Sequence, residues 1–438
     1  MNNSSDRKFW LARVADSRVT FVVFGILVFL LIHLRQNSIN NYGCELCSDK
    51  AGYYVYLPAT FQYGFHATDF PEHSDVQQGY GFHLDSVNNK VVTKFTCGVA
   101  MMQAPFYLVG KLFASSDTNP FSRHYLLFIN IGLAFYITLG LYFLKQWYAT
   151  QSNPVSAFVT VMIVFFGTHL YYYTLDESLM SHAYSFALLC TSLYALQRYE
   201  ANRKMSHFIL LVSALALAIL IRPTNLLFVP LVLFIGISSF AQLKNRLQQL
   251  VSVRNILVAA LFTLLIFLPQ LLYWKFAYGS YVAWSYTDEG FLNWNHPYFS
   301  EVWFSPQSGL FPYTPVLLLS LALCVFYWRK SKDALIVITL FFVVSYLCAA
   351  WSNPFFGECN FGKRPFVEYL PVLMLPVLWL VKKMQEQKPL MKWIGRSAII
   401  LLVLYNIWLF GAFDTCFGGE VWEWSKFGEL LSKGSLVP

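Results

Sequence analysis

The sequence predicts an all-α polytopic membrane protein with about eleven transmembrane helices. Of the 438 residues, 57% are hydrophobic, 18% are aromatic and only 12% are charged. Such a chain has too few polar residues to cover a water-soluble globule of this size. The apolar residues are gathered into stretches of roughly 16 to 22 residues, close to the roughly 20 that a helix needs to cross a bilayer.

The candidate spans are apolar stretches without the strict alternation of a membrane β-barrel, so we expect helices. They lie at 19–34, 124–144, 154–173, 179–196, 206–221, 224–240, 255–274, 310–328, 334–350, 366–381 and 397–413. The fifth and sixth stretches meet at Arg222 and Pro223. They could therefore form one re-entrant segment in place of two separate spans. Residues 97–113 include Pro105 and Lys111 and are expected to form a helix at the membrane interface.

The distribution of charge predicts which loops face the cytoplasm, because Lys and Arg accumulate on cytoplasmic loops. With the N-terminus inside, 19 of the 31 Lys and Arg residues fall on inner segments, whereas 18 of the 23 Asp and Glu residues fall outside. The net charge of +8 is therefore assigned to membrane anchoring, and no nucleic-acid partner is expected. The outer segments are 35–123, 275–309, 351–365 and the C-terminal 414–438.

The inner loops are short and contain no Gly-rich phosphate-binding loop. No nucleotide-binding domain and no internal repeat can be recognised, so residues 1–438 are treated as one transmembrane domain. Any chemistry is expected on the outer face, where ATP and nucleotide sugars are not available.

Cysteines on the outer side would meet an oxidising environment, so disulfide bonds among them are possible. Cys44 and Cys47 form a C-x-x-C pair in the first outer segment. Without a second pair or nearby histidines, a zinc site is not expected there. A local disulfide and two free thiols are both left open.

Asp49 follows the first span closely and is succeeded by an aromatic, amphipathic turn that includes Tyr53 and Tyr54. A carboxylate held by such a turn against the membrane surface would be partly desolvated. Desolvation raises the pKa of a carboxyl group and makes it a usable base. On composition alone, however, a loop Asp is more often a solvated or helix-capping residue.

Four segments stand out on the predicted outer side of the membrane: 49–59, 94–106, 303–315, and Trp351 with 360–366. Each segment is moderately specific by itself. Together and in this order, they resemble bacterial membrane glycosyltransferases of the GT-C class, the group that includes aminoarabinose transferases of lipid A and protein O-mannosyltransferases.

The resemblance implies a GT-C-like fold whose long first outer loop carries interfacial helices. It also implies inverting transfer of a sugar from a polyprenyl-phosphate lipid on the periplasmic face of a bacterial inner membrane. Asp49 would be the catalytic base, and Tyr53 and Tyr54 would contact substrate. Lys363 and Arg364 would bind the donor phosphate at the outer end of the tenth span, although interfacial anchoring would also place cations there.

Arg222 is a further candidate for the donor phosphate, because a charge between two apolar spans is costly unless it is paired. The acidic outer loops would pair it equally well, and Arg-Pro is also a plain helix break. Asp176 and Glu177, with His182 one helical turn later, would orient sugar hydroxyls or bind a divalent metal. They would alternatively cap the following helix.

Asp85 is a possible second acid of the site, although most acids of this loop are expected to be solvated. No cofactor is predicted with assurance, and a divalent metal is left open. The expected partners are a polyprenyl-phosphate sugar lipid, membrane lipids and a glycan, lipid or protein acceptor. The alternatives are a lipid or glycan transporter or flippase, and a polysaccharide polymerase or ligase. The sequence identifies neither the sugar nor the acceptor.

Overall fold

The structure is a computed structural model, and helices dominate the part of the chain that it describes. That part comprises residues 17–38, 46–286, 289–353, 360–413 and 417–436. Within it the only strands are a short antiparallel pair, β1 (His83–Asp85) and β2 (Lys90–Val92). Cα partners in this pair run from His83 with Val92 to Asp85 with Lys90. The predicted all-α class is confirmed, and residues 1–16, expected in the cytoplasm, lie outside the described residues.

Among the described residues, five helices are long and apolar enough to cross a bilayer, and a bent pair of helices is a sixth candidate. The five are α2 (Arg18–Ser38), α7 (Arg123–Ala149), α14 (Val253–Tyr278), α18 (Lys332–Ala350) and α21 (Pro389–Ala412). The bent pair joins η4 (Arg364–Tyr369) and α19 (Leu370–Leu373) to α20 (Leu375–Met384) at 43°. These six coincide with six of the predicted spans.

The remaining predicted spans contain shorter apolar helices, several of them in pairs. The short helices are α8 (Pro154–Phe166), α9 (Leu170–Leu175), α11 (Met205–Ile221), η3 (Pro223–Leu227), α12 (Phe228–Phe234), α16 (Leu310–Tyr313) and α17 (Pro315–Tyr327). The fourth predicted span coincides with α10 (Ser181–Asn202), which is long enough but less apolar. The number of eleven spans therefore stays a prediction.

The centre of the bundle is occupied by α10, which packs against α7, α11 and η4. Most of its side chains are buried between these neighbours, including Ser181, His182, Ser185 and Ser192. A helix that is surrounded by protein can carry polar groups where hydrogen-bond partners are available, which explains its composition. Gly140 of α7 allows close packing, because a Cβ there would lie 2.9 Å from the Cα of Ala187.

The outer surface of the bundle is apolar. Only 11% of the most apolar stretch of α14 is buried inside the protein. Its side chains Leu257, Leu261, Leu264 and Leu268 are between 41% and 65% exposed. An apolar surface of this extent is stable only when another apolar phase covers it. The protein is therefore a membrane protein, with lipid covering these helices.

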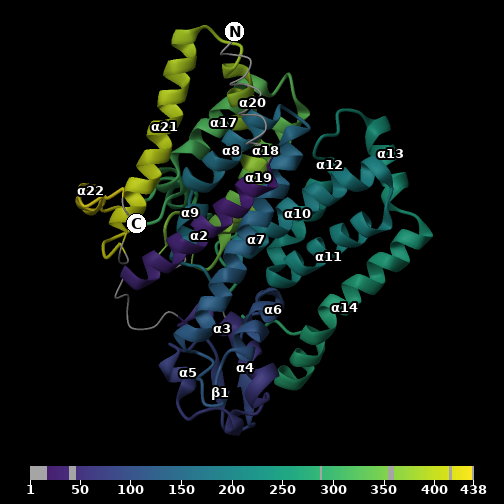
Figure 1. The fold of residues 1–438 in the computed structure, drawn as a ribbon, viewed down its shortest axis with the longest axis vertical. Helices are drawn as coiled ribbons and strands as arrows, with labels where there is room; N and C mark the ends of the chain where they lie inside the picture. Colours follow the sequence, from purple (N-terminus) through teal and green to yellow (C-terminus); the bar gives the residue numbers. More distant parts are fainter. Residues whose placement is uncertain (1–16, 39–45, 287–288, 354–359, 414–416, 437–438) are drawn as a thin grey trace.

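The first predicted outer loop folds into a compact group of short elements at one end of the molecule (Figure 1). Its elements, besides β1 and β2, are α3 (Asp49–Tyr54), α4 (Tyr56–Pro58), η1 (Ala59–Tyr63), η2 (Ala67–Asp69), α5 (Ser74–Gln77) and α6 (Gly98–Leu112). Tyr54, Phe82 and Tyr107 belong to a hydrophobic core that this group shares with α7, α11 and α14. The turn between α20 and α21 lies at the opposite end (Figure 1).

The other elements are connectors and a terminal helix. They are α13 (Phe240–Leu250), α15 (Phe299–Phe304) and α22 (Trp424–Ser432). The helix predicted at 97–113 is α6, which packs against α3, α7 and α11; its placement at the interface stays a prediction. Cys47 is disulfide-bonded, whereas Cys44 lies outside the described residues. The free cysteines among the described residues are Cys97, Cys190, Cys324 and Cys348.

Candidate active site

A cavity of about 1970 Å³ lies where the first outer loop meets the helical bundle. Sites for small molecules usually enclose roughly 300–1,000 Å³. This cavity is therefore large enough for two substrates or for part of a long lipid.

One wall of the cavity is apolar. It is formed by Leu226 and Leu227 of η3, Pro230 of α12, Trp274 of α14 and Leu347 of α18. Leu226 is 60% exposed, so this apolar part of the lining is accessible to a ligand. The apolar chain of a ligand could thus lie against it.

Asp49 is the first residue of α3 and lines the charged end of the cavity. Ser48 before it has φ 54°, in the left-handed region, and its backbone N–H donates to the Gln78 carbonyl at 3.0 Å. The Asp49 carboxylate meets Arg364 of η4, with 3.3 Å between Oδ2 and Nη1. The side chain of Asp49 is 36% exposed, so a substrate can reach its carboxylate.

Close packing beneath α3 fixes the position of Asp49. A Cβ on Gly52 would overlap both the ring of Phe95 and the carbonyl oxygen of Gly81, so only glycine fits there. On the cavity side, the ring of Tyr53 lies 4.3 Å from that of Phe95, and the Tyr53 hydroxyl donates to Ser181 Oγ at 3.2 Å. Burial raises the pKa of Tyr53, so the phenol stays protonated and acts as a donor.

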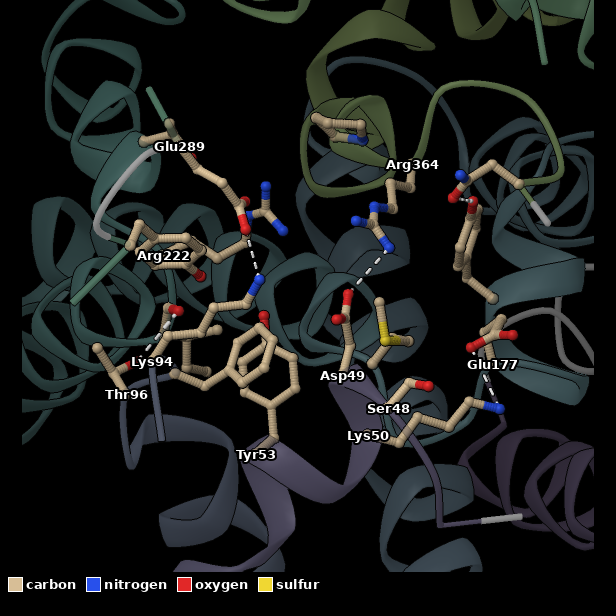
Figure 2. A pocket seen from close by; sticks show the side chains of 18 of the residues that line it. Ser48, Asp49, Lys50, Tyr53, Lys94, Thr96, Glu177, Arg222, Glu289 and Arg364 are labelled. Atoms are coloured by element: carbon tan, nitrogen blue, oxygen red, sulfur yellow. Dashed lines mark hydrogen bonds and ion pairs between the residues drawn. The ribbon is translucent and has the colours of Figure 1, made fainter. Parts of the chain in front are cut away.

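Ion pairs line the charged end of the cavity (Figure 2). Asp49 and Arg364 face each other in the middle. Lys94 and Glu289 lie on one side, with Nζ and Oε1 2.6 Å apart. Lys50 and Glu177 lie on the other side, 3.2 Å apart. Every one of these six side chains lines the cavity, so an incoming ligand meets charged groups whose own partners already hold them in place.

Arg222 lines the cavity on the same side as Lys94 and Glu289 (Figure 2). It sits at the break between α11 and η3, where Pro223 prevents the helix from continuing. Its Nε lies 3.2 Å from Oε1 of Glu368 in η4. Its Nη1 lies 3.3 Å from Nε2 of His182, whose Nδ1 is 2.9 Å from the same Glu368 oxygen.

The two predicted acids after α9 do not cap α10, whose N-cap is Met180. Asp176 instead forms a two-pronged ion pair with Arg35 of α2, at 2.7 Å and 3.0 Å. Burial raises the pKa of Asp176 to about 6, although Arg35 opposes the shift. Glu177 pairs with Lys50, and both acids line the cavity.

Lys363 and His182 lie beneath the lining of the cavity. Both side chains are fully buried. Lys363 Nζ donates to Ser308 Oγ at 2.8 Å, and burial lowers the pKa of Lys363 to about 7. Neither residue is placed for direct contact with a ligand in this conformation.

Tyr54 and Asp85 do not line the cavity. Tyr54 is buried in the core of the first outer loop, where its hydroxyl donates to the Pro120 carbonyl at 2.6 Å. Asp85 accepts hydrogen bonds from the backbone N–H groups of Val87 and Asn88 and from the Asn88 side chain. These bonds, and not burial, lower the pKa of Asp85. Tyr54 is thus a buried core side chain, and Asp85 lies in a solvated turn.

No cluster of three or more His, Cys, Asp or Glu side chains that could hold a metal ion occurs within the described ranges. Asp176 and Glu177 are engaged with Arg35 and Lys50 instead.

The sequence reasoning missed several residues of the site. Glu368 lies inside an apolar span, and an ionisable residue at such a position is itself a signal of function. Lys94 and Trp351 belong to segments that carry the family resemblance and line the cavity, but neither was assigned a role. Nothing in the sequence pairs Lys50 with Glu177 or Lys94 with Glu289, since these contacts span 127 and 195 positions.

Comparison with protein-family models, with curated proteins and with solved structures found no match to this chain.

Proposed function

We propose that this protein transfers a sugar from a polyprenyl-phosphate lipid to an acceptor, with inversion at the anomeric carbon. The observation that carries the proposal is the composition of the cavity. One part of its lining is apolar, and another part holds the carboxylate of Asp49, its ion-pair partner Arg364 and a second cation, Arg222. A lipid-linked phosphate sugar has the same two parts, an apolar chain and an anionic head.

The donor would lie with its isoprenoid chain along Leu226, Leu227 and Pro230. Its phosphate would then reach the side of the cavity that holds Arg222 and Lys94 (Figure 2). Guanidinium groups bind phosphate through paired, charge-assisted hydrogen bonds, which strengthen as the leaving phosphate gains charge.

Inversion requires the acceptor oxygen to attack from the side opposite to the leaving phosphate. With the phosphate near Arg222, the acceptor would enter from the side of Lys50 and Glu177, with Asp49 between the two substrates (Figure 2). Asp49 takes the proton of the acceptor hydroxyl, and the oxygen forms a bond to the anomeric carbon. The bond from that carbon to the phosphate oxygen breaks, and the lipid phosphate leaves with the electron pair.

Arg364 would serve both substrates. It lies 3.3 Å from the Asp49 carboxylate. A donor phosphate would compete for the guanidinium and leave the carboxylate available to the acceptor hydroxyl. Donor binding would thereby prepare the base.

The proposal includes the predicted topology: eleven spans, a cytoplasmic N-terminus and a periplasmic active site in a bacterial inner membrane. Pairs of short helices support the count, since α8 with α9 and α16 with α17 each fill one predicted span. Residues of three segments that resemble GT-C enzymes contribute to the cavity, including Asp49, Lys94 and Arg364.

The test is transfer by purified protein in detergent, with a panel of radiolabelled polyprenyl-phosphate sugars and a membrane extract as acceptor. We expect label to enter the extract with wild type and to fall by about 10²–10⁴-fold in Asp49→Asn, the contribution of a general base. The matched control is Asp69→Asn, since Asp69 is an exposed acid of the same loop outside the cavity.

The stability of the variant separates chemistry from folding. The Asp49–Arg364 pair is partly exposed, so its loss changes the free energy of unfolding by less than about 1 kcal/mol. Equal transfer by wild type and Asp49→Asn would refute the mechanism. No transfer from any donor would refute the proposed activity and favour a lipid or glycan transporter.

A further inference from the structure

Arg222, His182 and Glu368 form a closed triangle at the donor side of the cavity. Arg222 Nε and His182 Nδ1 approach one oxygen of Glu368 at 3.2 Å and 2.9 Å, and Arg222 Nη1 lies 3.3 Å from His182 Nε2. His182 and Glu368 are almost completely buried, whereas the side chain of Arg222 is 21% exposed towards the cavity. Two buried side chains, His182 and Glu368, thus contact the guanidinium of Arg222, which a ligand in the cavity can reach.

The hydrogen-bond roles in this triangle follow from the donors. A guanidinium only donates, so His182 Nε2 must accept the Nη1–H of Arg222. The neutral imidazole then carries its proton on Nδ1 and donates it to Glu368 Oε1. Glu368 therefore fixes the tautomer that allows His182 to accept from Arg222.

The triangle leaves one edge of the guanidinium for a ligand. Nε lies 3.2 Å from Glu368 Oε1 as an ion-pair contact, and Nη1 donates to His182 and, at 3.4 Å, to Ser181 Oγ. Nη2 has no hydrogen-bond partner among the described residues, and Arg222 lines the cavity. The N–H groups of Nη2 therefore remain available to a phosphate oxygen.

We propose that His182 and Glu368 are positioning residues that hold the Arg222 guanidinium in one orientation for the phosphate of the lipid donor. The inference rests on the proposed function, because it takes the ligand to be a lipid-linked phosphate. His182 itself touches no substrate. It acts by preventing a flexible arginine side chain from turning away, so the entropy of ordering that side chain is lost before the donor binds.

The same arrangement stabilises the fold around Arg222. A lone cation between apolar helices would be strongly unfavourable, and the Glu368 carboxylate neutralises it. The other Glu368 oxygen, Oε2, has no hydrogen-bond partner among the described residues. Glu368 thus depends on His182 and Arg222 for its side-chain contacts.

Two substitutions of His182 separate its two hydrogen bonds. The amide nitrogen of His182→Asn can replace Nδ1 and donate to Glu368, but nothing then reaches Arg222. The longer His182→Gln can place its amide oxygen near the Nε2 position and accept from Arg222. Both variants keep a polar side chain of similar size, so a general loss of packing would affect them alike.

The measurement is binding of undecaprenyl phosphate, with the uncharged undecaprenol as control, to the purified full-length protein in detergent. Intrinsic tryptophan fluorescence reports binding, since Trp274, Trp284 and Trp351 line the cavity. We expect His182→Asn to bind undecaprenyl phosphate about tenfold more weakly than wild type does. Its affinity for undecaprenol should be unchanged. His182→Gln should remain close to wild type with both lipids.

Equal affinities of the Asn and Gln variants for undecaprenyl phosphate would overturn the inference, and so would a parallel loss of undecaprenol binding. If neither variant folds, Arg222→Lys decides the question. It keeps the charge but loses the fixed fork, so unchanged phosphate affinity would also overturn the role of orientation. Wild type that binds the two lipids equally, or neither of them, would instead refute the proposed donor class.

Discussion

Arg364 offers the sharpest test of donor recognition, because one substitution distinguishes phosphate binding from membrane anchoring. Arg364→Gln removes the charge while keeping an amide of moderate length. A hydrogen bond to a charged group contributes about 1.5–3 kcal/mol when its partner would otherwise be left unpaired. We therefore expect kcat/KM for the donor to fall by about 10–150-fold, with a raised donor KM.

The structure limits how much of this effect could come from instability. The Arg364 side chain is 20% exposed and its Asp49 partner is 36% exposed. A partly exposed pair contributes less than about 1 kcal/mol to folding. Thermal unfolding in detergent should therefore change little, and a large loss of transfer would be a loss of recognition.

The assay is the initial rate of transfer at increasing donor concentration and fixed acceptor. Lys426→Gln is the matched control, since Lys426 is a partly exposed cation on α22 that pairs with Glu429 outside the cavity. It should behave as wild type. If Arg364→Gln leaves the donor KM and kcat unaltered, Arg364 does not bind the donor phosphate, and interfacial anchoring would be its remaining role.

Two further predictions concern pH and packing. Because burial raises the pKa of Asp176 to about 6 from 3.8, its stabilising contribution is fully present below pH 3.8 and is lost as the pH rises through about 6. Between pH 3.8 and about 6, the thermal midpoint of wild type should fall more than that of Asp176→Asn. The same pH dependence of the midpoint in both proteins would contradict the raised pKa of Asp176. Gly52→Ala should lower the free energy of unfolding by about 1–3 kcal/mol and reduce transfer, because its Cβ would overlap Phe95 and Gly81. Chemical denaturation measures this, with Gly428→Ala, whose Cβ meets nothing within 4 Å, expected to be neutral.

The sequence predicts the fold best where helices face lipid. Spans such as 255–274 are uniformly apolar because α14 exposes most of its surface. The bend in the span 366–381 was not predicted, although Pro371 and Pro376 lie on either side of the break between α19 and α20. Hydropathy averages over such a stretch and does not report a change of direction.

The site was predictable only in part, and for a physical reason. Asp49 and Arg364 were selected through the family resemblance, and the structure brings them together. Arg222 was expected to need a counter-charge, but the outer loops or the donor were expected to provide it. The structure shows Glu368 in that place, because tertiary packing brings η4 against α10. No local pattern encodes that contact.

The Asp49–Arg364 contact also has a consequence for how the protein is made. Its two residues are 315 positions apart in the chain. At the usual speed of synthesis, roughly 15–60 s separate their emergence from the ribosome. During that time the nascent chain carries the acid of the site without the cation that faces it. A chain that stops before η4 would retain Asp49 but lack Arg364 and Glu368 together, so under the proposed function premature termination would produce a fragment without transfer activity.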